Sequence, residues 1–111
     1  MKKQVQGIRS VKNIEDFSGF DSEQVVRTIE ENKDIILKVE PYKPHDSFED
    51  AIDVYLNLKA EKTRLVDGIL NIFNKFEATS VNLEYNKTRG TTHGIRILRF
   101  WWDRHDRLRN I

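Results

Sequence analysis

The chain has 111 residues and a formal net charge of +1, with 33% of its residues charged and 38% hydrophobic. This balance argues against a disordered chain, the length predicts a single domain over residues 1–111, and the lack of cysteine excludes disulfides and thiolate chemistry. No apolar run approaches the ~18 residues of a membrane span and the N-terminus lacks a signal-peptide core, so we expect a cytoplasmic protein with no membrane partner.

The first segment, residues 1–20, fits two structures. Apolar residues recur every third position from Val5 to Phe17, which is typical of helical turns. The short polar alternation around Gly7 fits a strand equally well. The sequence therefore leaves open whether this segment is helix or strand.

A helix and a strand are predicted next. Asp21 has the properties of an N-cap, and Gln24 three residues later would complete a capping box for a helix over residues 21–33. Because only about three apolar positions support this helix, we expect it on the surface. The β-rich run over residues 35–40 predicts a strand that ends at Pro41, which has no backbone donor.

The longest periodic pattern covers residues 48–76. Its members alternate steps of three and four, which keeps side chains on one face of an α-helix. They are Phe48, Ala51, Tyr55, Leu58, Lys62, Leu65, Ile69, Ile72 and Phe76. Asp46 or Ser47 would cap this helix, and the acids of residues 46–53 would meet the positive end of its dipole. We therefore predict one long central helix against which the rest of the chain packs.

The middle of this pattern conflicts with the size of the domain. A helix of this length would span roughly 43 Å, whereas a domain of this size has a radius of gyration of only ~13 Å. The stretch 59–64 is polar, and it places Lys62 within the apolar stripe. The helix would break at this stretch, or else the whole helix would reach a second copy of the chain. Since the stretch holds no glycine or proline, we favour a continuous helix. One end of that helix could then contact a partner or a second copy, as a homodimer through residues 48–76.

Two further strands close the predicted fold. Polar and apolar residues alternate over residues 80–87, and a second run covers residues 94–102, with a polar glycine-containing loop between them. The pair predicts a C-terminal antiparallel hairpin. The fold class is therefore α+β, in which a small antiparallel sheet of three to four strands packs on one long central helix plus a shorter helix.

Charge is distributed unevenly along the chain. Residues 13–61 hold thirteen acids and five bases, whereas residues 62–111 hold ten bases and five acids. Arginines and tryptophans in the basic part are candidates to contact phosphates, stack on bases or anchor a protein partner. The candidate binding residues are Lys87, Arg89, Arg96, Arg99, Trp101, Trp102, Arg104 and Arg107.

Alternation along the last strand separates these residues into two faces. Ile97, Arg99 and Trp101 share one face with Ile95, and the other face holds Arg96, Leu98, Phe100 and Trp102. Only one face can pack on the central helix. If nothing covers the other face, it is a large apolar patch of the kind that often marks a binding site.

No catalytic, cofactor or metal site is predicted. The three histidines, His45, His93 and His105, lack the spacing of a metal site, and no motif places a nucleophile near any of them. The sequence therefore indicates a non-enzymatic binding module that engages nucleic acid or a nucleoprotein through the basic, aromatic C-terminal hairpin. The alternatives are a small inhibitor or adaptor for a protein partner, encoded by a phage or mobile element, and a structural homo-oligomer built on the long helix.

Overall fold

The computed structural model describes residues 5–15, 19–42, 49–85 and 96–103, and some residues at the ends of strands by their backbone alone. These backbone-only residues are Glu49, Asp50, Glu84, Tyr85, Arg96 and Asp103. In chain order the elements are α1 (Ile8–Lys12), α2 (Ser22–Glu31), β1 (Ile36–Tyr42), β2 (Glu49–Leu56), α3 (Lys62–Phe76), β3 (Ser80–Tyr85) and β4 (Arg96–Asp103). The α+β prediction is confirmed.

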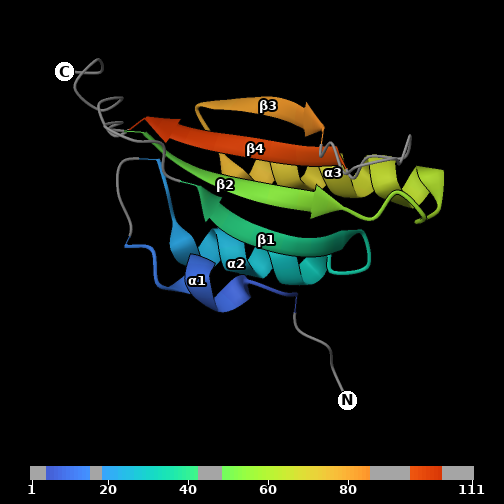
Figure 1. Cartoon of the computed structure of the whole chain (residues 1–111), viewed down its shortest axis with the longest axis horizontal. Coiled ribbons are helices and arrows are strands. Elements are labelled where there is room, and N and C mark those ends of the chain that lie inside the picture. The colour runs from blue at the N-terminus through green and yellow to red at the C-terminus, as the bar shows by residue number, and fades with distance from the viewer. Residues whose placement is uncertain (1–4, 16–18, 43–48, 86–95, 104–111) are drawn as a thin grey trace.

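The four strands form one antiparallel sheet in the order β1-β2-β4-β3. In Figure 1 the helices α2 and α3 lie behind this sheet, with α2 below β1 and α3 behind β4. The predicted strands at residues 35–40, 80–87 and 94–102 correspond to β1, β3 and β4, and the last two pair as an antiparallel hairpin. Residues 86–95 at the tip of that hairpin lie outside the described residues.

The predicted long helix is wrong over its first part, because the central strand β2 occupies residues 49–56. Ile52 and Val54 point into the helical core, whereas Ala51 and Asp53 point to the opposite side of the sheet and are also buried. With both faces buried, the strand lacks the polar–apolar alternation that identifies a half-exposed strand. The apolar residues on its two faces, on both sides of Asp53, therefore matched a helical spacing by chance.

The polar stretch after β2 is a true boundary. The side-chain carbonyl of Asn57 accepts a hydrogen bond from the backbone N–H of Lys59, which forms a turn without glycine or proline. Helix α3 then starts at Lys62, because the Glu61 carboxylate accepts hydrogen bonds from the backbone N–H groups of Thr63 and Arg64. The proposed caps Asp46 and Ser47 lie outside the described residues, and a strand, not a helix, follows them.

The N-terminal half supplies a second helical layer. Asp21 caps α2 as predicted, with its carboxylate accepting the backbone N–H of Gln24. More of α2 is buried than the sequence indicated, since Thr28 joins the three apolar residues on its inner side. Residues 5–15 combine both open alternatives: α1 is helical, and Gln6 forms a parallel bridge to Lys38 at the edge of β1.

The core lies between the sheet and the helices. Phe76 of α3 packs edge-on against Phe100 of β4, with ring centroids 4.7 Å apart. The indole N–H of Trp102 donates a hydrogen bond of 3.2 Å to the carbonyl oxygen of Phe76. Trp102, only 1% exposed, is thereby fixed beneath the sheet by both apolar contact and a satisfied polar atom.

Candidate binding site

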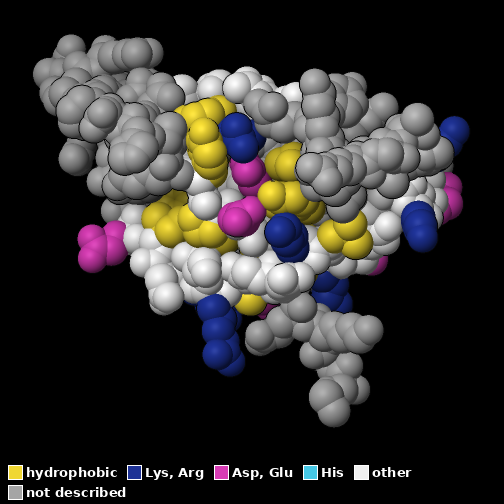
Figure 2. Space-filling view, in the orientation of Figure 1, with side chains coloured by type: hydrophobic (Ala, Val, Ile, Leu, Met, Phe, Trp, Pro, Cys, Tyr) yellow, Lys and Arg dark blue, Asp and Glu magenta, His cyan; other side chains and the backbone are white. Residues whose placement is uncertain are grey.

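The side of the sheet opposite the helices is here called the open face. The strand pairings place Lys38, Glu40, Tyr42, Ala51, Asp53, Tyr55, Ser80, Asn82, Ile97, Arg99 and Trp101 on it. No helix in the described part of the chain packs on this side. Figure 2 shows the open face, where hydrophobic side chains surround a central group of acidic and basic side chains.

Two aromatic rings meet over a small residue at one end of this face. Ala51 of β2 lies opposite Tyr42 of β1 on one side and opposite Trp101 of β4 on the other. Because the alanine side chain is short, the two rings approach each other across it, edge-on, with centroids 5.9 Å apart. The result is a half-buried aromatic pair that spans the three strands.

A buried ion pair lies beside the aromatic pair. The guanidinium of Arg99 donates from Nε to Oδ1 of Asp53 at 2.7 Å and from Nη2 to Oδ2 at 3.0 Å. The same guanidinium lies 3.8 Å from the centre of the Tyr42 ring, within cation–π range. This geometry fixes Arg99 and holds the Tyr42 ring in place.

A second polar pair lies on the other side of Asp53. The hydroxyl of Tyr55 donates a 2.9 Å hydrogen bond to the Glu40 carboxylate, and the ammonium of Lys38 lies 4.5 Å from the centre of the Tyr55 ring. Burial of the phenol, followed by its hydrogen bond to Glu40, raises the pKa of Tyr55 to about 12. Tyr55 is therefore a neutral donor at physiological pH.

One polar atom of this site has no partner. The indole Nε1 of Trp101 is buried, yet it donates to no acceptor among the described residues. A buried donor without an acceptor costs about 1–3 kcal/mol, and such atoms are rare in folded proteins. By contrast, the neighbouring Trp102 has its acceptor within the core. The two adjacent tryptophans thus lie on opposite faces of the sheet, and only the indole N–H of Trp102 has a hydrogen-bond acceptor among the described residues.

The predicted site residues separate into four groups. Arg99 and Trp101 lie together on the open face, whereas Trp102 lies in the core. Arg96 begins β4 and is described by its backbone alone. The remaining four, Lys87, Arg89, Arg104 and Arg107, lie outside the described residues, as do His45, His93 and His105.

Sequence reasoning missed the partners that complete the site. Asp53 and Tyr55 were assigned to the long helix, and Tyr42 to a loop, so none was expected near Arg99. The informative signal was the β-branched content of Ile52 and Val54, which favours a strand over a helix at this point.

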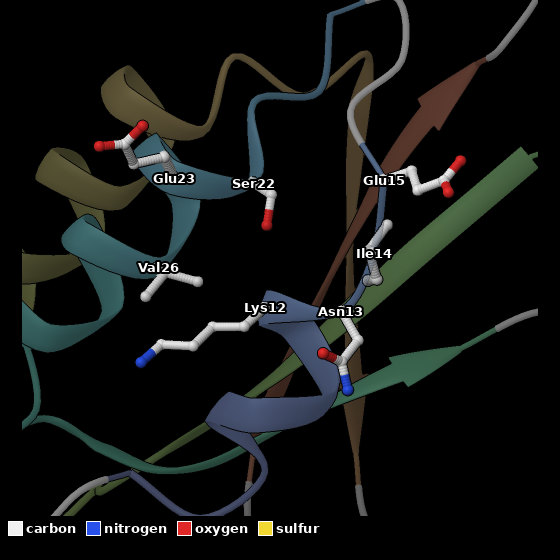
Figure 3. A pocket seen from close by; sticks show the side chains of 7 residues that line it. All are labelled: Lys12, Asn13, Ile14, Glu15, Ser22, Glu23 and Val26. Carbon is white, nitrogen blue, oxygen red and sulfur yellow. The ribbon is translucent and has the colours of Figure 1, made fainter.

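Other features of the described residues offer weaker sites. A hollow of about 470 Å³ lies between the end of α1 and the start of α2. Figure 3 shows that its charged side chains, Lys12, Glu15 and Glu23, point in different directions and converge on no common point. Within the described ranges, no cluster of histidine or acidic side chains could hold a metal ion, and no helix has the length and apolarity to cross a membrane.

Comparisons with protein-family models, with curated proteins and with solved structures found no match. The chain is therefore interpreted from its own geometry.

Proposed function

We propose that the protein is a non-enzymatic, cytoplasmic binding module that holds single-stranded nucleic acid, free or in a nucleoprotein, on the open face of its sheet. The observation that carries the proposal is the unpaired indole N–H of Trp101 beside the half-buried ring of Tyr42. An exposed base offers both a flat surface for an aromatic ring and acceptor atoms along its edge. A single base could therefore pack against the aromatic pair, and a rotation of the Trp101 ring would bring its buried N–H to an acceptor on that base.

The charges of the open face favour contact with bases over contact with phosphates. Lys38 and Arg99 are balanced by Glu40 and Asp53, and Arg99 already binds Asp53. An aromatic surface whose described side chains carry no excess positive charge suits stacking, which tolerates any base because every base has a π-face. We therefore assign base contacts to this face.

Phosphate contacts would come from basic residues that precede and follow β4 in the sequence. Lys87 and Arg89 precede the strand in sequence, and Arg104 and Arg107 follow it directly. These four basic residues are the candidates for contacts with the phosphates of a strand that packs its bases on the open face. Binding should then weaken as salt rises, because each phosphate contact releases counterions.

The direct experiment measures the fluorescence anisotropy of a short labelled single-stranded oligonucleotide at low salt. The protein should raise the anisotropy, and Tyr42→Ala should weaken binding by about tenfold or more, in line with ~1–3 kcal/mol per stacked base. Trp101→Phe keeps an aromatic ring but removes the N–H donor, and it should weaken binding to a smaller extent.

Leu58→Ala provides the matched control, because Leu58 is an exposed apolar residue away from the open face. It should bind like the unmodified protein. Absence of any anisotropy change with single-stranded DNA or RNA at low salt would refute the proposed function.

A protein partner is the second candidate, and the lack of excess positive charge among the described side chains of the open face favours it. Tyrosine, tryptophan and arginine are the residue types enriched at interface hot spots, and Tyr42, Arg99 and Trp101 bring all three together. An inhibitor or adaptor of this kind should capture the same partner from its native host with and without nuclease. Capture that is lost on nuclease treatment would instead support nucleic acid.

A further inference from the structure

Helix α3 carries an exposed apolar stripe on the side turned away from α2. Val66 and Leu70 are 55% and 54% exposed, and Phe73 continues the stripe one turn later. Gly68, on the other side of the helix, approaches Asn32 and Ile35 where α3 packs against α2. The stripe therefore marks the side of α3 where the helical layer ends.

The underside of β3 extends the same apolar surface. Val81 and Leu83 lie opposite Phe100 and Leu98 in the hairpin, so they share the helix-facing side of the sheet, yet both are exposed. Phe73 contacts β4 beside this surface, since its ring packs 5.7 Å from that of Phe100, the residue paired with Val81. We call Val66, Leu70, Phe73, Val81 and Leu83 the α3–β3 patch. An apolar patch formed by two adjacent elements is a typical mark of an interface.

The outer edge of β3 has no pairing segment among the described residues, unlike the opposite edge of the sheet. Along β1, the carbonyl of Gln6 accepts the backbone N–H of Val39, and Pro41 removes a further donor. Strand β3 contains no proline and no lysine, and no described segment pairs with its outer edge. Such an edge is a template for pairing with another strand.

We propose that a second copy of this chain covers the α3–β3 patch, in a two-fold dimer in which β3 pairs antiparallel with the partner's β3. With the two-fold axis at Asn82, Val81 lies opposite the partner subunit's Leu83, so two apolar cross-strand pairs form beneath the joined sheet. The α3 helices then lie antiparallel under the new seam.

The charged residues at the two ends of the α3 stripe have opposite signs, which suits an antiparallel arrangement. Lys62 lies one turn before Val66, and Glu77 lies one turn after Phe73. A lysine at the start of a helix and a glutamate at its end both oppose the helix dipole, so the helix itself does not explain them. Antiparallel packing brings each Lys62 beside the partner's Glu77. This charge match favours a second copy over an unrelated partner.

Sedimentation velocity over a range of protein concentrations tests the dimer. We expect reversible dimerisation of the unmodified chain, and Leu83→Lys should raise the dissociation constant about tenfold or more, because two charges enter one seam. Leu37→Lys is the matched control, since Leu37 is 45% exposed and Leu83 is 47% exposed. It should leave the dimer unchanged.

A charge exchange tests the orientation of the helices. Lys62→Glu and Glu77→Lys should each weaken the dimer, and the double variant should restore it, because opposite charges meet again. A chain that stays monomeric at high concentration overturns the proposal. A dimer that withstands Leu83→Lys, or a double variant weaker than both single ones, overturns this interface.

Discussion

Arg99 and Asp53 form a two-pronged ion pair between residues that lie 46 positions apart in the chain. Their side chains are only 19% and 5% exposed, so water screens the pair weakly. Asp53 also lies opposite Glu40 across the β1–β2 pairing, which places two acids side by side. The guanidinium of Arg99 therefore compensates a buried negative charge and connects the central strand to the aromatic pair.

Arg99→Ala should destabilise the fold by about 3–5 kcal/mol, because it leaves the Asp53 carboxylate buried without a counter-ion. Urea unfolding followed by circular dichroism measures this loss. The exposed pair Arg27–Glu23, with side chains 60% and 83% exposed, is the control, and Arg27→Ala should change stability by less than about 1 kcal/mol. Equal effects of the two substitutions would contradict the buried ion pair.

Tyr55 should ionise only in strongly alkaline solution. Because folding raises the pKa of Tyr55 to about 12 from its usual 10.0, its stabilising contribution is complete below pH 10 and is lost as pH rises through about 12. The absorbance of tyrosinate during an alkaline titration measures the pKa of Tyr55. Glu40→Gln removes the negative charge that favours the neutral phenol, so it should lower the pKa of Tyr55. An unchanged titration in that variant would show that Glu40 does not contribute.

Gly7 is held in a conformation that only glycine adopts without strain. Its φ is +89°, and a Cβ at this position would overlap with the carbonyl oxygen of Val39. Gly19 has a similar φ of +80°, but a Cβ there would lie 4.0 Å from the nearest atom, in the Trp102 ring. Gly19→Ala should thus cost only the backbone strain of about 1–2 kcal/mol, and Gly7→Ala should cost clearly more. Thermal unfolding of the two variants provides the comparison.

Acid should weaken the contact between α3 and the turn that follows α2. The hydrogen bond from Arg64 lowers the pKa of Asp34, so this ion pair stabilises the fold above the usual pKa of 3.8 and its contribution is lost as pH falls. Asp34→Asn should therefore lower stability at neutral pH and reduce the further loss on acidification. Urea midpoints at neutral and acidic pH test this, and parallel losses in both proteins would contradict it.

The strands of the hairpin were predictable because their pattern is local. Leu98 and Trp102 alternate with Arg99 and Trp101, and the structure places the first pair in the core and the second on the open face, as the alternation required. Asp21 likewise identified the start of α2 from three neighbouring residues. Signals of this kind depend only on residues close in sequence.

The central strand and most of the site were not predictable in this way. Asp53 is acceptable in a buried strand only because Arg99 reaches it from β4, and Tyr42 meets Trp101 only because both flank Ala51. These relationships depend on strand order and register, which a single sequence does not reveal. Ala51 fits the helical spacing of the sequence and Asp53 fits the acidic start of a helix, so the sequence predicts a helix at both positions.

The indole N–H signals of the two tryptophans test the binding proposal most directly. In a nitrogen–proton correlation spectrum at low salt, a single-stranded oligonucleotide should shift the Trp101 signal, because its donor gains an acceptor. The Trp102 signal should stay in place, because its N–H remains bonded to Phe76 in the core. Trp101→Phe assigns the two signals. If the Trp101 signal does not move at saturating oligonucleotide, the open face is not the binding site.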